Sequence, residues 1–128
     1  MFGFMHETTF TVTVGEDYGT LTIANVSVEY NKTATITPNF STTAGSSLAV
    51  TYTYDTSKIS IDGNTVTGLV AEAVVTVTAK TDKHETTFTV TVGKDYGTLT
   101  IANVSVAYNG TATISPKFST TAGSSLAV

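Results

Sequence analysis

The feature that most constrains the fold is an internal repeat. Residues 6–50 recur as residues 84–128, which lie 78 positions further along, and only five positions differ. The differing pairs are Glu16/Lys94, Glu29/Ala107, Lys32/Gly110, Thr37/Ser115 and Asn39/Lys117. Near-identity over such a length is typical of small domains joined in tandem. We therefore expect a window on a longer array, since 128 residues cover about 1.6 units of 78.

The composition argues against several classes of protein. The net charge is −4 at pH 7 and the six lysines are scattered, so we expect no nucleic-acid partner. No apolar run approaches the roughly 20 residues that cross a bilayer, so we expect no membrane insertion. The opening five residues are too short for a signal peptide, and any export signal is expected outside this window. The absence of cysteine removes disulfides and thiol catalysis.

Apolar and polar residues alternate along most of the chain. In residues 9–14, Phe10, Val12 and Val14 share one face while threonines share the other, and residues 87–92 repeat this pattern. Such alternation predicts half-buried strands. Polar segments with a glycine at each end follow both strands, at 15–19 and 93–97, and predict turns or linkers.

The alternation changes phase between residues 20 and 30. Leu21 and Ile23 occupy odd positions, whereas the next apolar residues, from Val26 onward, occupy even positions. A strand that switches its buried face needs a bulge or kink, which we expect near residues 24–25. A first strand that crosses from one sheet to another would have this pattern.

The remaining pattern predicts short strands and turns. Further strands are expected at 33–40 (interrupted at Pro38), 48–54, 59–61, 66–70 and 73–79, with a loop at 41–47, a hairpin turn at 62–64 and an exposed turn at 80–84. No apolar pattern with helical spacing persists, so we expect essentially no helix. About seven strands between residues 19 and 92, with turns every 8–12 residues, predict an all-β antiparallel sandwich.

Residues 19–92 resemble a bacterial immunoglobulin-like domain of the second group. The segments that carry the resemblance are 33–38, 59–68, 70–79 and 87–92. This family is repeated in intimin- and invasin-like surface proteins and is appended to phage tail proteins. The resemblance implies an Ig-like β-sandwich of about seven strands. Two departures are Tyr52 and Tyr54, where the family commonly has Trp, and Glu72, where it usually has Gly.

The resemblance and the repeat together predict a domain organisation. Residues 1–18 are expected to be the last strand and linker of a preceding repeat, 19–92 a complete domain, and 93–128 a linker and the first half of a following repeat. The single central segment, 51–83, could alternatively pair with the second copy in a permuted domain, 51–128. We expect contiguous use of 19–92. Residues 97–128 would then be ordered through another chain, by strand-exchanged self-association.

No pattern in the sequence assigns a catalytic, metal-binding or ligand-binding residue. His6 and His84 each neighbour a glutamate but lack the ligand number of a metal site, so we expect exposed residues where a strand begins. The acidic residues unique to the central segment are Asp55, Asp62, Glu72 and Asp82. Their spacing does not point to two carboxylates facing one cleft, and turns are the expected setting of the first two. We expect neither enzyme activity nor a cofactor.

The linker carboxylates and the tyrosines are the remaining candidate sites. The pair Glu16-Asp17 could clip calcium, but Lys94 replaces one carboxylate in the second copy, so solvated linker charge is expected. Tyr18 and Tyr96 are expected to pack between neighbouring domains. The in-phase residues Tyr30, Tyr52 and Tyr54 are expected in the core rather than stacked on sugar rings.

The leading functional hypothesis is a structural or adhesive module of a bacterial cell-surface protein. Such a module acts as a spacer or as a weak binder of glycan or protein, and its partners are neighbouring repeats and a cell-surface glycan or host protein. The alternatives are an Ig-like display module of a phage virion, on a tail or capsid, and a self-assembling extracellular fibre subunit. Fold alone does not choose between these roles.

Overall fold

The computed structural model describes residues 3 and 5–128, so positions 1, 2 and 4 of the predicted segment 1–18 lie outside the described residues. Within the described residues the chain forms strands and two four-residue helices, which confirms the all-β prediction. The elements are β1 (Leu21–Ile23), β2 (Val26–Val28), β3 (Thr33–Thr35), β4 (Pro38–Phe40), α1 (Thr43–Ser46), β5 (Thr51–Thr53), β6 (Ile59–Asp62), β7 (Thr65–Gly68), β8 (Val74–Lys80), β9 (Glu85–Val92), β10 (Leu99–Ile101), β11 (Pro116–Phe118) and α2 (Thr121–Ser124).

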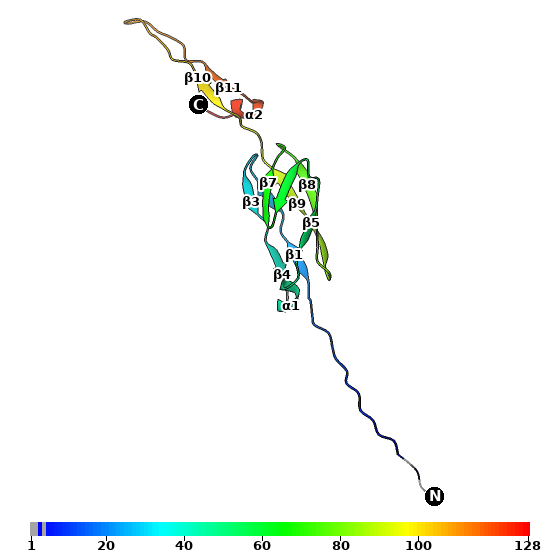
Figure 1. Ribbon diagram of the computed structural model, residues 1–128. Helices are drawn as coiled ribbons and strands as arrows, with labels where there is room; N and C mark the ends of the chain where they lie inside the picture. The colour runs from blue at the N-terminus through cyan, green and yellow to red at the C-terminus, as the bar shows by residue number, and fades with distance from the viewer. Residues whose placement is uncertain (1–2, 4) are drawn as a thin grey trace.

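Two larger sheets build the central part of the molecule. One has four strands in the order β2-β9-β8-β5, and the other has three in the order β3-β7-β6. The longest ladder joins β8 to β9 antiparallel, whereas β2 joins the free edge of β9 in parallel. Two small pairs, β1-β4 and β10-β11, complete the structure. Figure 1 places the second small pair beyond one end of the sheets and the N-terminal segment beyond the other.

A single core joins the two sheets. Side chains from β2, β8 and β9 meet side chains from β6, β7 and the β3–β4 connection in one buried cluster. Its members are Val28, Ile36, Ile59, Val66, Val75, Val77, Ala79, Phe88, Val90 and Val92. Valine and isoleucine dominate because branched side chains fill a pleated, buried face well. All members of this cluster therefore come from residues 28–92.

The predicted phase change at residues 24–25 is confirmed. β1 ends at Ile23 and pairs with β4, whereas β2 begins at Val26 and pairs with β9. The same first segment thus serves two sheets, and Leu21 and Val28 are both buried although they differ in parity.

The predicted interruption at Pro38 is also confirmed. β3 ends at Thr35 and β4 begins at Pro38, because proline cannot donate to a continued ladder. Between them the amide of Ile36 donates to the carbonyl of Asn64 at 2.7 Å. Two of the seven predicted strands are each split in this way, which accounts for nine strands between residues 21 and 92.

The strand predicted at residues 9–14 is not formed, although the same six residues form part of β9 at 87–92. Phe10 is 86% exposed, whereas Phe88 is 3% exposed. In Figure 1 the N-terminal segment runs out from the domain as an extended chain. The difference is tertiary, since β9 lies between β8 and β2 and residues 9–14 lie beside neither.

Three smaller predictions, one of a loop and two of strand lengths, were wrong in part. The predicted loop at 41–47 contains α1, because the Thr42 hydroxyl accepts from the amide of Gly45 and caps a helical turn. The strand predicted at 48–54 is shortened to β5. The strand predicted to continue through residues 69–70 ends at Gly68, since both following amides turn to the carbonyl of Lys58.

The central segment pairs with the first copy of the repeat. β2 pairs with β9 and β3 pairs with β7, whereas β10 and β11 form a sheet of their own. This is the pairing expected from contiguous use of residues 19–92 rather than 51–128. The boundaries at residues 18/19 and 92/93, and the ordering of 97–128 through another chain, stay predictions.

Replacing Glu72 with Gly should stabilise the domain. Glu72 lies in the turn before β8 with φ +62°, a left-handed conformation that costs a side-chain-bearing residue about 1–2 kcal/mol. Glycine removes that strain but gains entropy in the unfolded chain, so we expect a net gain of about 1 kcal/mol. Urea unfolding measures it. The neighbouring change Ala71→Gly, at a residue without positive φ, should give no gain, and equal effects of both changes would contradict the explanation.

Candidate functional site

The acidic residues of the central segment do not converge. Among the described residues no group of three or more histidines or carboxylates is placed to hold a metal ion. Asp55 is in the turn setting predicted for it. Its carboxylate accepts from the hydroxyl of Ser57 at 2.6 Å and from the Ser57 amide at 3.0 Å, and these hydrogen bonds hold the pKa of Asp55 below its ordinary value. Asp62 ends β6 beside the predicted hairpin turn, where Gly63 has φ +60°.

The three in-phase tyrosines lie at the edge of the core. Tyr30, Tyr52 and Tyr54 are half-buried and pack against the core cluster, as predicted. The Tyr52 hydroxyl donates to Asn64 Oδ1 at 2.7 Å, and burial raises the pKa of Tyr52. The Tyr54 hydroxyl accepts from the amide of Ile61 at 2.9 Å. These tyrosines therefore tie the sheets together, and their rings are partly covered.

His84 is not the exposed residue that was predicted. It is half-buried in the turn between β8 and β9, and its Nε2 lies 2.8 Å from the carbonyl oxygen of Tyr18 and 3.1 Å from that of Gly19. Carbonyls only accept, so Nε2 carries the proton and donates. In the neutral imidazole Nδ1 then accepts from the hydroxyl of Thr81, at 2.8 Å.

Further contacts complete a unit that we call the linker clamp: Tyr18, Gly19, Phe40, Thr81, Lys83 and His84. The Thr81 hydroxyl oxygen also accepts from the amides of Lys83 and His84. The Lys83 ammonium lies 5.4 Å from the centre of the Tyr18 ring, in cation–π range. The Phe40 ring meets the His84 ring edge-on, with centroids 5.6 Å apart. The clamp fixes where the linker enters the domain.

The linker carboxylates bond to their own backbone. Asp17 Oδ1 accepts from the amide of Gly19 at 2.9 Å, and Asp95 Oδ1 accepts from the amide of Gly97 at the same distance. Both glycines have positive φ, and a Cβ on Gly19 would collide with the hydroxyl of Ser41. Each linker therefore makes the same tight turn before its copy of the first strand.

A groove lies where the domain meets the second linker, and we call it the junction groove. Its volume is about 610 Å³, within the range of ligand-binding clefts. It is lined by Glu29, Tyr30, Lys32 and residues 93–97. Tyr96 was predicted to pack between neighbouring domains, and here it is 48% exposed on the wall of this groove, on the same lining as Tyr30.

The charge of the junction groove is where the two copies differ most. Glu29, Lys32 and Lys94 line it, and they account for three of the five differing positions. The Glu29 carboxylate accepts from the Lys32 ammonium at 2.9 Å, and this hydrogen bond raises the pKa of Lys32. In the second copy the equivalents of this pair are Ala107 and Gly110, so the pair is lost. The differences between the two copies were visible in the sequence, but only the fold shows that Glu29, Lys32 and Lys94 line one groove.

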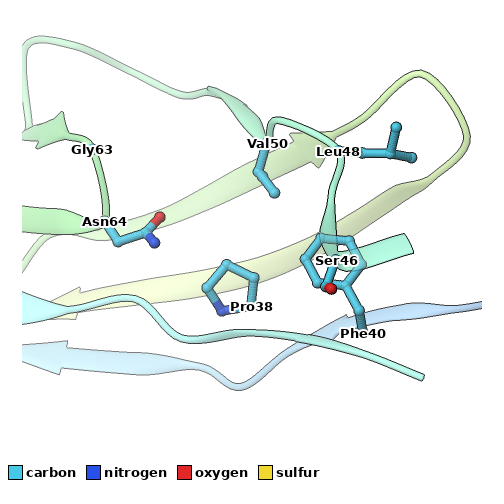
Figure 2. A pocket seen from close by; sticks show the side chains of 7 residues that line it. All are labelled: Pro38, Phe40, Ser46, Leu48, Val50, Gly63 and Asn64. Atoms are coloured by element: carbon cyan, nitrogen blue, oxygen red, sulfur yellow. The ribbon is translucent and has the colours of Figure 1, made fainter. Parts of the chain in front are cut away.

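A second hollow lies beside α1 and holds about 480 Å³. Figure 2 shows that its lining comes from three places in the chain: Pro38 and Phe40 of β4, then Ser46, Leu48 and Val50, and finally Gly63 and Asn64 of the β6–β7 turn. None of these side chains is charged, and the Asn64 amide oxygen already accepts from Tyr52. The hollow therefore offers apolar contact without a reactive or charged group.

Replacing His84 with Ala should loosen the linker clamp. The change removes hydrogen bonds to the linker and to Thr81, and a net hydrogen bond contributes about 1 kcal/mol. We expect a loss of about 1–2 kcal/mol in the free energy of unfolding, measured by thermal melting at low protein concentration. His6→Ala is the matched control, since His6 is followed by the same residues as His84 but is exposed. Equal losses for the two variants would mean that the clamp does not stabilise the domain.

Comparison with known proteins adds no assignment. No protein-family model and no curated protein matches the chain. Within the described residues no helix has the length and apolarity needed to cross a membrane. The candidate functional features of the chain are thus the linker clamp, the junction groove and the repeat itself.

Proposed function

We propose that this chain is a structural and adhesive module of a bacterial cell-surface protein, built from Ig-like β-sandwich domains repeated in tandem. The strand order supports the fold. Counted with β1–β2 and β3–β4 as one strand each, the sheets follow the order of an immunoglobulin domain, with strands two, five and four in one sheet and three, six and seven in the other. The near-identical repeat supports an array, because reiterated units add length.

The observation that carries the spacer role is the parallel pairing of β2 with β9. These strands lie near the two ends of the domain in sequence, at Val26–Val28 and Glu85–Val92. In an array, tension pulls the start of β2 and the end of β9 in opposite directions along the strand axes. The evenly spaced bonds of a parallel ladder are then loaded together in shear. An arrangement of this kind suits a module that holds a distal domain away from the cell.

Single-molecule force spectroscopy tests the spacer role. The chain has no cysteine, so handles can be attached through Thr20→Cys and Lys94→Cys, which load the ladder in shear. The control pair Glu29→Cys and Lys94→Cys pulls the same ladder from one end, because Val28 lies opposite Val92. Forced unfolding reports the barrier to unfolding. We expect a clearly higher unfolding force in the first geometry, and equal forces would refute the mechanical role.

The adhesive part of the proposal concerns the junction groove. Two tyrosines and charges of both signs line it, and tyrosine provides an apolar ring with a polar tip for contact with sugars. The change of its charge between copies would alter binding along an array without altering the fold. About half of the Tyr96 surface is exposed, so its ring is accessible for stacking on a sugar.

A glycan array tests this part with the 128-residue chain. Tyr96→Ser should reduce any glycan signal. The control Tyr108→Ser should leave it unchanged, because Tyr108 is 95% exposed and lies outside the groove, although it is the repeat equivalent of Tyr30. Equal losses from both changes, or no signal for the unmodified chain, would remove the glycan role and leave the spacer role to the force measurement.

A further inference from the structure

Both sides of one interface inside the domain recur elsewhere in the chain with the same residues. Residues 6–15 repeat 84–93 without a difference, and residues 96–106 repeat 18–28 without a difference. In the domain, residues 84–93 and residues 18–28 are the copies that pack against each other, since they contain β9 and β2. The other two copies, 6–15 and 96–106, pair neither with each other nor with the two larger sheets, and within 96–106 only β10 is paired, with β11. We call residues 6–15 the donor and residues 96–106 the acceptor.

The interface that is already formed has defined contacts. In the parallel β2–β9 pair the register is Val26 opposite Val90, Ser27 opposite Thr91 and Val28 opposite Val92. Additional hydrogen bonds join the amide of Gly93 to the carbonyl of Val28 (2.8 Å), the amide of Thr89 to Asn25 Oδ1 (2.9 Å), and His84 to Tyr18 (2.8 Å).

The unused copies of these segments expose apolar side chains. Val12 is 74% exposed and Val14 is 87% exposed in the donor, and in the acceptor Val104 is 45% and Val106 is 61% exposed. Their counterparts in β2 and β9 are buried or half-buried. Open strand edges with apolar side chains are templates for pairing with another chain.

We propose that residues 6–15 of one molecule pair in parallel with residues 103–106 of a second copy of this chain. The register places Val12 opposite Val104, Thr13 opposite Ser105 and Val14 opposite Val106. In Figure 1 the two segments lie toward opposite ends of the molecule, so one molecule does not join its own ends. Each copy then offers one donor and one acceptor, and such a head-to-tail contact generates an open chain of molecules.

The repeat also supplies equivalents of the contacts around the strand pair. His6 matches His84, Tyr96 and Gly97 match the linker residues of the clamp, and Phe118 matches Phe40. Asn103 matches Asn25 and accepts from the amide of Thr11 in the proposed register. The second copy thus contains an equivalent of every linker-clamp residue that residues 18–40 contribute in the domain.

The proposed contact is weaker than the one inside the domain. β9 also pairs with β8 along its other edge, and the chain holds no second copy of residues 51–83. A small interface of this kind gives reversible, concentration-dependent association. Head-to-tail pairing does not depend on the adhesive role proposed above, since it follows from contacts between identical segments.

Disulfide capture tests the register in the full chain. Adjacent strands lie about 4.8 Å apart, and disulfides bridge Cα atoms about 4.4–6.8 Å apart. Two single-cysteine chains, Thr13→Cys and Ser105→Cys, are mixed under a redox buffer. Ser27→Cys with Thr91→Cys in one chain is the positive control, because these residues face each other in the domain. Thr9→Cys mixed with Ser105→Cys is the control for register.

We expect several-fold more disulfide dimer from Thr13→Cys than from Thr9→Cys. Equal capture from the two would mean random collision and would overturn the proposal. Preferential capture of Thr13→Cys by Ser27→Cys of another molecule would also overturn it, since the donor would then be exchanging into an intact domain.

Sedimentation velocity supplies an independent readout without cysteines. The unmodified chain should show a weight-average sedimentation coefficient that rises with protein concentration. Val12→Asp should abolish the rise and His6→Ala should reduce it, and both variants should melt as the unmodified chain does at low concentration, since both residues are exposed. A sedimentation coefficient independent of concentration, or one unaffected by Val12→Asp, would overturn the proposal.

Discussion

Phe88→Ala should destabilise the domain by about 3–5 kcal/mol, whereas Phe10→Ala should change its stability by less than about 0.5 kcal/mol. Both phenylalanines lie in the same ten-residue sequence, but Phe88 is 3% exposed in β9 and Phe10 is 86% exposed. Phe88 packs in the core cluster and meets the ring of Tyr52 edge-on, with centroids 6.1 Å apart. Removing it leaves a cavity among side chains that belong to both sheets.

Thermal melting at low protein concentration measures this difference. For a domain of this size, 1 kcal/mol corresponds to about 4–8 °C, so Phe88→Ala should lower the melting temperature by more than about 12 °C. The free energy of unfolding of a small domain is only about 5–15 kcal/mol, so Phe88→Ala should remove a large share of it. Equal shifts for the two variants, or a larger shift for Phe10→Ala, would mean that the first copy of the strand occupies the core.

Gly68→Ala should cost about 1–3 kcal/mol, although alanine is the smallest side chain that can be added. Gly68 is buried at the end of β7, where a Cβ would lie 2.7 Å from Val92 Cγ1 and 3.2 Å from the carbonyl oxygen of Glu29. The backbone of Gly68 also holds the turn after β2, since its carbonyl accepts from the amide of Asn31 at 2.9 Å. The added methyl group would push β7 away from both β2 and β9.

Gly93→Ala is the matched control for this prediction. A Cβ on Gly93 would meet its nearest neighbour, the Cα of Glu29, at 3.6 Å, which is ordinary van der Waals contact. We therefore expect its unfolding free energy to stay within about 0.5 kcal/mol of the unmodified chain. Urea unfolding of both variants provides the comparison, and a Gly68→Ala variant as stable as Gly93→Ala would show that the β7 end is loosely packed.

Local patterns predicted the elements of the fold well where each depended on its own residues. The change of parity between Ile23 and Val26 was enough to place the break between two sheets, because side-chain direction in a strand alternates with each residue. Pro38 was enough to place the break between β3 and β4. The turn helix α1 was missed, although threonine is a favoured first residue of a helix and the Thr42 hydroxyl accepts from the backbone amide of Gly45.

Local patterns failed where partners distant in sequence decide the outcome. Residues 9–14 and 87–92 are identical, so nothing in their own sequence could distinguish an exposed chain from a buried strand. The same holds for His6 and His84, since the clamp depends on a contact between residues 66 positions apart. The junction groove was missed for a related reason. The residues that line it follow β2 and β9 in the sequence, and they come together only because these two strands pair in parallel.

Hydrogen exchange followed by NMR tests the central claim most directly, because it reads both copies of each strand in one sample. The claim is that the central segment completes the first copy of the repeat and leaves residues 9–14 and the second copy outside the domain. At a concentration low enough to keep the chain monomeric, amides in 26–28 and 87–92 should exchange slowly, while those in 104–106 and 9–14 exchange at the rate of an unfolded chain. Protection of 104–106 together with rapid exchange in 26–28 would contradict the account, since the central segment would then be paired with the second copy.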